Sequence, residues 1–481
     1  MFTNRLGFFL GPVLFLILFI LIPSDFISPN AYKVIAVAAW MICWWVTESA
    51  PFPVTALVPL IMFPVLGVMP MNQAAAPYAN PIIFLFMGGF FIALALEKHR
   101  LHERIALNII RITGTSGNGI ILGFTISTAF ISMWISNTAT AMMMLPIALS
   151  VVKLIIPDVT QIKDGPSTPE RNFALGLMLV VGYAATLGGL ATIIGTPPNV
   201  VFVGLLSAFS GQKISFGEWM IVGVPVMLAL LASNYFIVTR ILFPNRLDKI
   251  RGSDELISTK LKELGPLRRE EKFVMMIFLA TSFFWIFQEA INYWVGSEVL
   301  NDTNIAMAGG LLMFVVPIEL KKLTFLLDWG DTKNMAWGIL ILFGGGLCLA
   351  EGLNKTGIIQ AIGGWIVSQT DYNIWFMLIL IIISVALSEM MSNVALVNIF
   401  VPVIFGIAQG LNINPILLAL PVTLSASIGF MFPIATPPNA IVFSSGYIRI
   451  KDMMRAGILL NISCIIIIWI ASLTIVRWVF G

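Results

Sequence analysis

The pattern of hydrophobic and polar positions divides this chain into long apolar runs separated by short polar segments. The run from Gly119 to Val152 contains no Asp, Glu, Lys, Arg or His, and its polar interruption is Ser136-Asn137-Thr138. A helix crosses the hydrocarbon core in about 20 residues, so this run is too long for one simple span. Two shorter legs that meet at the polar triplet fit it better. The pattern predicts a re-entrant hairpin that enters and leaves on the same side of the membrane.

The polar break occurs twice along the chain. Ser392-Asn393-Val394 repeats the triplet inside a second apolar stretch. Each triplet is followed by another interrupted run, Gly195-Thr196-Pro197-Pro198-Asn199 in the first half and Ala435-Thr436-Pro437-Pro438-Asn439 in the second. Such a duplication decides the architecture. It predicts hairpins over 118–155 and 373–411 and broken helices over 172–208 and 414–447.

The remaining apolar runs fit a chain built from two repeats. We expect a first transmembrane helix over 1–30, a first repeat over 31–243, a linker over 244–272 and a second repeat over 273–481. Between Arg240 and Lys272 nine basic residues face six acidic ones, which favours a cytoplasmic linker. Five spans and one hairpin per repeat turn the second copy upside down. The fold class is therefore an all-α polytopic membrane protein with two inverted repeats, about eleven transmembrane helices, two re-entrant hairpins and helices broken at the midplane, an organisation typical of secondary transporters.

Composition excludes several other classes of protein. Hydrophobic residues make up 58% of the chain, charged residues 11%, and the mean hydropathy is +0.96, which places the chain in a lipid bilayer. A net charge of +3 gives no indication of a nucleic-acid partner. Cys43, Cys348 and Cys464 are widely spaced in apolar runs, so we interpret them as packing residues. His99 and His102 lack further ligands at metal spacing and are interpreted as a polar helix end. No cofactor and no enzymatic activity are expected.

The two broken helices carry a chemistry that follows from their prolines. Proline removes a backbone donor and cannot continue the preceding helix, but it can begin the next one. Free carbonyls therefore remain on one side of each break, and free N–H groups with a positive dipole end on the other. The N–H groups suit an anion and the carbonyls suit a small cation such as sodium. Irregular backbone at this depth is tolerated where it is buried in protein or lines a wet cavity.

The absence of basic residues around the breaks is equally informative. The stretches 112–152, 172–212 and 372–448 contain no Lys, Arg or His, and their one acidic residue is Glu389. An anionic substrate must then be held by neutral dipoles, and its charge needs a counter-ion while it crosses the bilayer. Bound sodium would supply that charge. Two simpler interpretations stay open: Ser and Asn bond neighbouring helices, and Glu389 pairs at a helix end.

These segments resemble the divalent-anion:sodium symporters, the family that includes the INDY transporters. Ser136-Asn137-Thr138 is similar to the hairpin-tip motif of that family. The stretch 426–442, ASIGFMFPIATPPNAIV, is similar to its signature near the C-terminus, and Trp44–Glu48 with Pro51–Leu57 is similar to its early segment. The resemblance covers essentially the whole chain. It implies a homodimeric carrier of dicarboxylates, citrate or sulfate, with a scaffold domain and a transport domain that moves as an elevator. Separately, the lack of a large extramembrane domain in the sequence favours a bacterial plasma membrane.

The resemblance also implies a site. Substrate carboxylates would be held by Ser136, Asn137, Thr138, Ser392, Asn393, Val394, Thr196, Thr436 and Pro437. Two sodium ions would bind at Ser132, Ser136, Asn137 and Gly195 in the first half and at Ser388, Asn393 and Ala435 in the second.

Val394 departs from the family pattern, in which the second triplet usually ends in threonine. Valine keeps the shape but lacks the hydroxyl, so one hydrogen bond worth about 1 kcal/mol is absent. Some relatives exchange dicarboxylates without sodium, and both modes stay open here. We therefore expect a transporter of C4–C5 dicarboxylates such as succinate, malate or 2-oxoglutarate, as sodium symporter or exchanger. Sulfate or citrate is the alternative substrate, and a channel is the alternative class of function.

Overall fold

The computed structural model describes residues 2–24, 26–156, 168–369 and 374–481. Asn373, the expected first residue of the second hairpin, lies outside the described residues. The described chain is almost entirely helical, with one two-stranded antiparallel pair, β1 (Pro317–Glu319) and β2 (Thr324–Phe325). Seven of its helical segments are long and apolar enough to cross a membrane, and ten shorter apolar helices accompany them. The predicted all-α polytopic class is confirmed.

The first half contains the first hairpin and the first broken helix. The hairpin is α8 (Gly117–Ser132) with α9 (Asn137–Lys153), and the broken helix is α11 (Pro169–Gly188) with α12 (Pro197–Ser210). Two 3₁₀ turns, η2 (Gly189–Ala191) and η3 (Ile193–Gly195), bridge the break. The other elements are α1 (Phe2–Leu21), α2 (Ala31–Thr47), α3 (Phe52–Ala56), α4 (Val58–Val65), α5 (Met71–Ala75), η1 (Ala76–Ala79), α6 (Pro81–Lys98), α7 (Leu101–Ile112), α13 (Phe216–Phe236) and the π-helical η4 (Ile237–Leu242).

The second half repeats this order. Its hairpin is α19 (Ile374–Ser388) with α20 (Asn393–Gly410), and its broken helix is α21 (Pro415–Ala426) with α22 (Pro437–Ser444). The other elements are α14 (Ser253–Glu263), α15 (Arg269–Val295), α16 (Asp302–Val315), η5 (Trp329–Asn334), α17 (Trp337–Lys355), α18 (Ile358–Gln369), α23 (Ile450–Leu473) and α24 (Ile475–Phe480).

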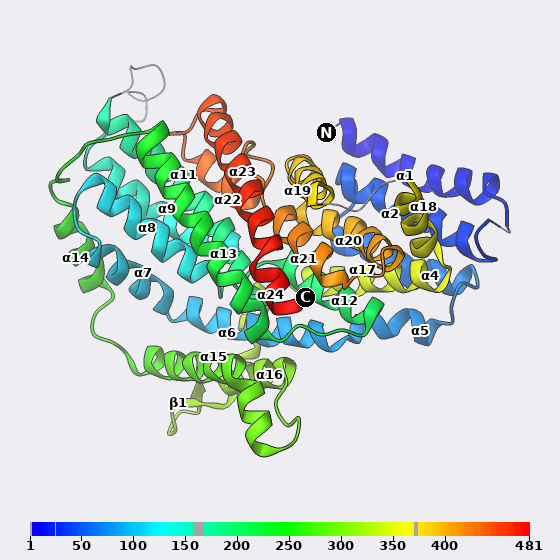
Figure 1. Ribbon diagram of the computed structural model, residues 1–481. Helices are drawn as coiled ribbons and strands as arrows, with labels where there is room; N and C mark the ends of the chain where they lie inside the picture. Colours follow the sequence, from blue (N-terminus) through cyan, green and yellow to red (C-terminus); the bar gives the residue numbers. More distant parts are fainter. Residues whose placement is uncertain (1, 25, 157–167, 370–373) are drawn as a thin grey trace.

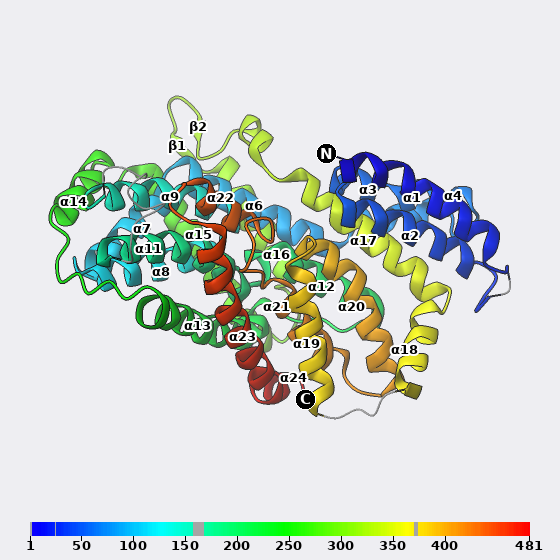
Figure 2. The same ribbon diagram turned by 90° about the horizontal axis from the view of Figure 1, so that it is seen from above.

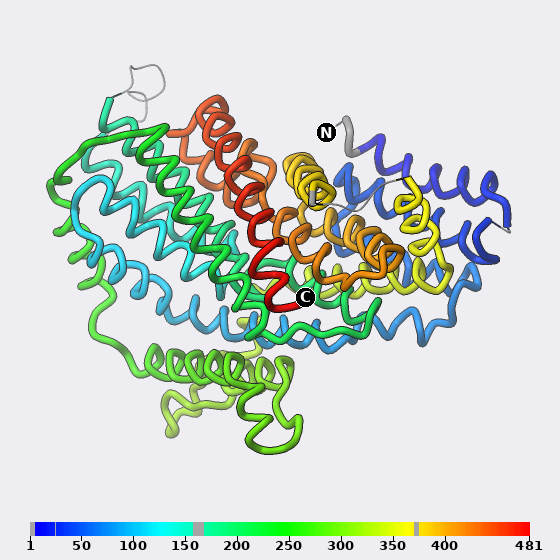
Figure 3. The backbone as a smooth tube through the Cα atoms, viewed as in Figure 1, coloured from blue at the N-terminus to red at the C-terminus, as the bar shows by residue number. Residues whose placement is uncertain are grey.

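The two hairpins lie in different parts of an elongated molecule. Figure 1 shows α8 and α9 at one end beside α11 and α13, whereas α19 and α20 lie toward the other end beside α17 and α18. The view from above agrees, with α21 and α23 between the two groups (Figure 2). The smooth trace shows the linker that carries α14 running along the outer edge of the molecule to α15 (Figure 3).

The second legs of the broken helices exchange partners between the halves. α12 packs against α20 and α21 of the second half, and α22 packs against α9 and α11 of the first. One large apolar cluster runs through both halves from α6 to α24. A smaller cluster joins α1–α4 to α17 and to Ala395 at the start of α20. Each half therefore completes the core of the other, and the polar breaks are held between them.

The observed boundaries differ from the sequence prediction in three places. The first leg of the broken helix predicted over 172–208 ends at Gly188 and gives way to two 3₁₀ turns, although the apolar pattern continues to Ile194. The apolar run after Pro53 is not one span, because it divides at Leu57 into α3 and α4. The linker 244–272 is partly helical: it contains α14, and α15 already begins at Arg269.

Close packing or burial accounts for several glycines, for the cysteines and for His102. A Cβ placed on Gly88 would lie 2.5 Å from the backbone of Ala306, and one on Gly345 would lie 2.1 Å from Ala56 O, so these glycines permit close helix packing. The three cysteines are free and buried. His102 Nδ1 lies 2.7 Å from Leu96 O near the end of α6, consistent with a polar helix end.

Candidate substrate and ion site

The first hairpin tip is a short turn that is held in place by hydrogen bonds. α8 ends at Ser132, and Ser136 begins α9 by accepting the backbone N–H of Ala139 at its Oγ (3.2 Å). Ser132 Oγ donates to Ala185 O on α11 at 2.6 Å. Ser and Thr oxygens at such positions satisfy donors that a helix start leaves free. The tip is thus fixed both to its own helix and to the broken helix beside it.

Asn137 lies against a cluster of oxygen atoms. With its amide nitrogen turned inward it donates to Ser132 Oγ, Ala185 O and Gly195 O at 2.7, 3.1 and 3.2 Å. A Cβ placed on Gly189 would lie 2.5 Å from the Asn137 side chain and 3.0 Å from Gly195 O, so no other residue fits there without a shift. The structure therefore brings Ser132, Asn137 and Gly195, three of the four expected ligands of the first sodium ion, into direct contact.

The break between α11 and α12 is closed by one amide and one hydroxyl. Asn199 Nδ2 donates to Gly189 O (3.0 Å) and Thr192 O (2.8 Å), so a side chain replaces the missing helical N–H donors. Thr192 Oγ1 donates to Met133 O at 2.5 Å and joins the break to the hairpin tip. Asn199 is fully buried, and its Oδ1 has no hydrogen-bond partner.

The second half reproduces this geometry at matching positions. Ser388 Oγ donates to Asn393 Oδ1 at 3.0 Å, as Ser132 lies against Asn137 in the first half. Asn439 Nδ2 donates to Gly429 O (2.8 Å) and Phe432 O (3.1 Å), at the same sequence separations of 10 and 7 residues as Asn199. Asn439 Oδ1 is likewise buried without a partner.

Ala435 also lies at this second site. A Cβ on Gly429 would lie 3.0 Å from Ala435 Cβ and 3.1 Å from Ser388 O. The structure therefore brings together the expected residues of the second ion site as it does those of the first.

Glu389 is the acid of the second tip, and its carboxylate is fully engaged. Oε1 accepts the backbone N–H groups of Phe430 (2.7 Å) and Met431 (3.0 Å) and the amide of Asn461 (2.7 Å). Its side chain is 7% exposed. Backbone donors at the end of a helix stabilise a carboxylate without a basic partner. Glu389 could be a functional acid or a residue that pairs at a helix end, and the structure favours pairing. We call this hydrogen-bonded support of the second tip its brace.

The remaining predicted substrate residues lie at the starts of four half-helices. Thr196 and Thr436 precede α12 and α22 and are buried, whereas Pro437 is exposed. Ser392 does not cap its helix with its side chain, which leaves the first N–H groups of α20 free for a ligand among the described residues, whereas α12 begins with Pro197 and Pro198, which have no N–H group. Ser136, Asn137, Thr138, Ser392, Asn393 and Val394 are half-buried. Within the described residues no hydrogen bond joins the two tips.

Val394 has apolar surroundings at the second tip. Its side chain packs against both apolar clusters, including the one that α1–α4 form with α17. The hydroxyl that threonine would add is therefore absent from a surrounding that is largely apolar.

Three residues that hold the site together were not among the site residues predicted from the sequence. Asn199 and Asn439 close the two breaks, and Thr192 joins the first break to the first tip. The signal for the asparagines was present, since both double prolines are followed by asparagine. Nothing local in the sequence indicates Thr192, because its partner is 59 residues away.

Comparison with known proteins supports the class that this architecture defines. The fold is shared with two solved transporters: that of the Alcanivorax borkumensis YdaH transporter (TM-score 0.57, 11% identity, 87% of this chain and 89% of that one) and MtrF of Neisseria gonorrhoeae (TM-score 0.54, 12% identity, 85% and 84%). At these identities the likeness shows the fold alone, and duplicated broken helices and hairpins are an organisation typical of secondary transporters.

Sequence similarity places the chain within that class. Residues 4–481 match the family of the sodium:sulfate symporter transmembrane region. The sodium-dependent dicarboxylate transporter SdcS of Staphylococcus saprophyticus is 39% identical over 480 residues, which is 99% of this chain and 92% of the relative. SdcS of Staphylococcus aureus is 38% identical over 96% and 89%. The chain belongs to this sodium:sulfate symporter family, the divalent-anion:sodium symporters that its motifs resemble.

Proposed function

We propose that the protein carries C4–C5 dicarboxylates such as succinate, malate or 2-oxoglutarate across the plasma membrane together with sodium. The observation that carries this proposal is the pair of matching tips, each with a serine bonded to an asparagine beside a proline break. Two such tips suit the two ends of an elongated dianion. The relatives named as sodium-dependent dicarboxylate transporters support the same substrate and ion.

Sodium coupling is supported by the chemistry around Asn137. Three oxygens, Ser132 Oγ, Ala185 O and Gly195 O, surround its amide nitrogen. The same oxygens, with the amide turned so that Oδ1 joins them, form the set of neutral hard ligands that a small cation prefers. A bound cation would offset the charge of a dicarboxylate that no Lys, Arg or His of the surrounding stretches compensates.

The transport cycle is proposed to follow the elevator scheme in a homodimer. The hairpins and broken helices would move as one body because α12 and α22 each pack into the opposite half. The helices α1–α6 and α15–α17 would remain as the scaffold. Sulfate and citrate stay the alternative substrates of the same site.

Ligand-dependent thermal unfolding of the purified protein tests the substrate assignment without transport. In sodium buffer, succinate, malate or 2-oxoglutarate is expected to raise Tm, because a ligand that binds the folded state stabilises it. The rise is expected to be absent with choline in place of sodium and absent in Asn137→Ala. A rise with sulfate or citrate alone would reassign the substrate, and no rise with any of these anions would contradict the assignment.

A further inference from the structure

A cavity lies beside the first hairpin, and the residues that line it are not among the predicted ligands. It has a volume of about 520 Å³ and separates α9 from the end of α6, from α7 and from α14. One wall is apolar and comes from the hairpin, including Ile135 and Ala139, the residues on either side of Ser136-Asn137-Thr138. The other wall is polar and contains Glu97, His102 and Lys260. The cavity therefore begins beside the first tip and ends at charged residues.

The charged end of the cavity lies on the side of the membrane that carries the linker. The open end of the hairpin is tied to that linker by Gly117 N–H to Leu247 O (2.8 Å) and Ile250 N–H to Thr115 O (2.9 Å). Lys260 lies on α14 within the same linker. The positive-inside tendency makes this side cytoplasmic.

Some charged residues on the polar wall have a partner of opposite charge, and others do not. Arg100 is held by Glu103 through two hydrogen bonds of 3.0 and 2.7 Å, so its charge is neutralised locally. Burial lowers the pKa of the His102 imidazole, which is therefore uncharged at neutral pH. Lys260 has no acidic partner within the described residues, and Glu97 has none either. Lys260 and Glu97 thus remain on the wall of the cavity without an ion-pair partner among the described residues.

A polar group also lies on the hairpin wall. Thr140, one helical turn beyond the tip, is 1% exposed, lines the cavity and has a hydroxyl without a hydrogen-bond partner. A buried hydroxyl that is left unpaired costs free energy, which a ligand or water in the cavity would recover.

We propose that this cavity is the vestibule through which a dicarboxylate reaches the first tip from the linker side, with Lys260 attracting the anion and Glu97 opposing it. The substrate part of this proposal rests on the proposed function. A charged residue at the mouth of a cleft raises the local concentration of ions of opposite sign.

Cysteine labelling tests the route independently of the substrate. Ala139→Cys, in vesicles of known orientation, is expected to react with a membrane-impermeant thiol reagent added on the linker side. Ala141→Cys is the matched control, because Ala141 is fully buried two residues further along α9. The native cysteines are buried and serve as background. Labelling of Ala139→Cys that is no faster than that of Ala141→Cys, or that occurs from the opposite side alone, would overturn the vestibule even if dicarboxylate transport is demonstrated.

Substitutions of opposite sign test the electrostatic role. For succinate supplied on the linker side, Lys260→Ala is expected to raise the half-saturating concentration about threefold, and Glu97→Gln to lower it by a similar factor, with both effects fading at high ionic strength. Lys262→Ala is the control, since Lys262 is exposed on the same helix and does not line the cavity. Equal behaviour of Lys260→Ala and Lys262→Ala would remove Lys260 from the route. If the protein does not carry succinate at all, the proposed function fails, while the labelling result still decides the route.

Discussion

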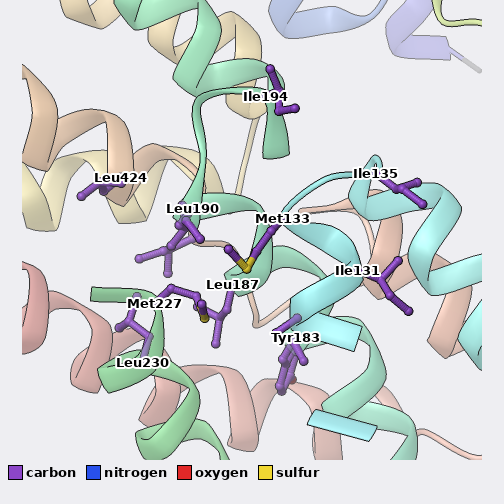
Figure 4. Close-up of a cluster of buried hydrophobic side chains, with 14 of the residues drawn as sticks. Ile131, Met133, Ile135, Tyr183, Leu187, Leu190, Ile194, Met227, Leu230 and Leu424 are labelled. Atoms are coloured by element: carbon purple, nitrogen blue, oxygen red, sulfur yellow. The ribbon is translucent and has the colours of Figure 1, made fainter. Parts of the chain in front are cut away.

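The two hairpin tips share one hydrogen-bonded pair but are held in place by different means. In each, a buried serine lies against the asparagine that opens the next helix, at 2.7 Å in the first half and 3.0 Å in the second. In the first tip, Met133 inserts into an apolar cluster with Leu187 and Leu190 (Figure 4). In the second, Glu389 stands at the matching position and accepts hydrogen bonds instead.

This difference separates what the site needs from what merely supports it. The serine–asparagine pair and the amide that closes each break recur at matching positions, so we assign the ligand chemistry to them. The residue that supports the tip differs between the two halves. It is the apolar Met133 in the first half and, in the second, the carboxylate Glu389, which accepts backbone N–H groups. The second tip also contacts the apolar cluster of α1–α4 through Val394. Among the described residues, none from the first tip packs against that cluster.

The largest effect is expected from removing either asparagine. Asn137→Ala and Asn393→Ala should each lower sodium-dependent succinate affinity at least about tenfold, because a hydrogen bond to a charged group is worth about 1.5–3 kcal/mol. Substrate titration of the purified variants measures this. If Asn393→Ala leaves affinity unchanged while Asn137→Ala abolishes it, the two tips do not share one role.

A smaller effect is expected from crowding the break. Gly189 has φ −60°, so alanine there is limited by space alone, and its Cβ would lie 2.5 Å from Asn137. Gly189→Ala should destabilise the site by about 1–3 kcal/mol through overpacking. Gly429→Ala is the matched change, with its nearest atom at 3.0 Å, and should cost less. Thermal unfolding and uptake of the two variants compare them, and a reversed order would contradict the packing described here.

Removing the charge of the second brace should affect stability more than affinity. Glu389→Gln loses one of the oxygens that face Phe430, Met431 and Asn461, which leaves a buried donor unsatisfied at a cost of about 1–3 kcal/mol. A lower Tm with nearly unchanged substrate affinity is expected. Glu298→Gln, at an exposed position, controls for the loss of an acid. Loss of sodium dependence in Glu389→Gln at unchanged Tm would make Glu389 an ion ligand instead of a brace.

The smallest effect is expected at the departure from the family pattern. Val394→Thr adds a hydroxyl within a largely apolar contact, so uptake should change by less than about fivefold, the equivalent of one neutral hydrogen bond of about 1 kcal/mol. Thr138→Val is the reciprocal change in the first tip. A change in the sodium dependence of uptake in Val394→Thr, compared with the parent protein, would show that this position sets the mode of coupling.

The sequence placed the helix ends around the first tip well, because chemical features mark them, and the re-entrant course of these helices through the membrane stays a prediction. Charge-free runs and the serine-asparagine breaks place the first hairpin at 118–155, and the structure has helices over 117–132 and 137–153. The early end of α11 at Gly188 was not predictable, since an uninterrupted apolar pattern continues to Ile194. There the helix gives way because Asn199 takes over the carbonyls of Gly189 and Thr192 from across the break.

Roles that depend on distant partners were also beyond the sequence. Glu389 became a brace through Asn461, 72 residues away, and the vestibule is lined by α7 and α14, which the hydrophobic pattern did not resolve. The convergence of both tips on one dicarboxylate stays a prediction.

Uptake of labelled succinate into proteoliposomes tests whether the protein couples dicarboxylate transport to sodium. An inward sodium gradient, present or absent, is combined with unlabelled dicarboxylate inside, present or absent. We expect saturable uptake into empty vesicles that requires sodium, because sodium compensates the charge held by neutral dipoles. Uptake that requires internal dicarboxylate and is indifferent to sodium would contradict it and would make the protein an exchanger.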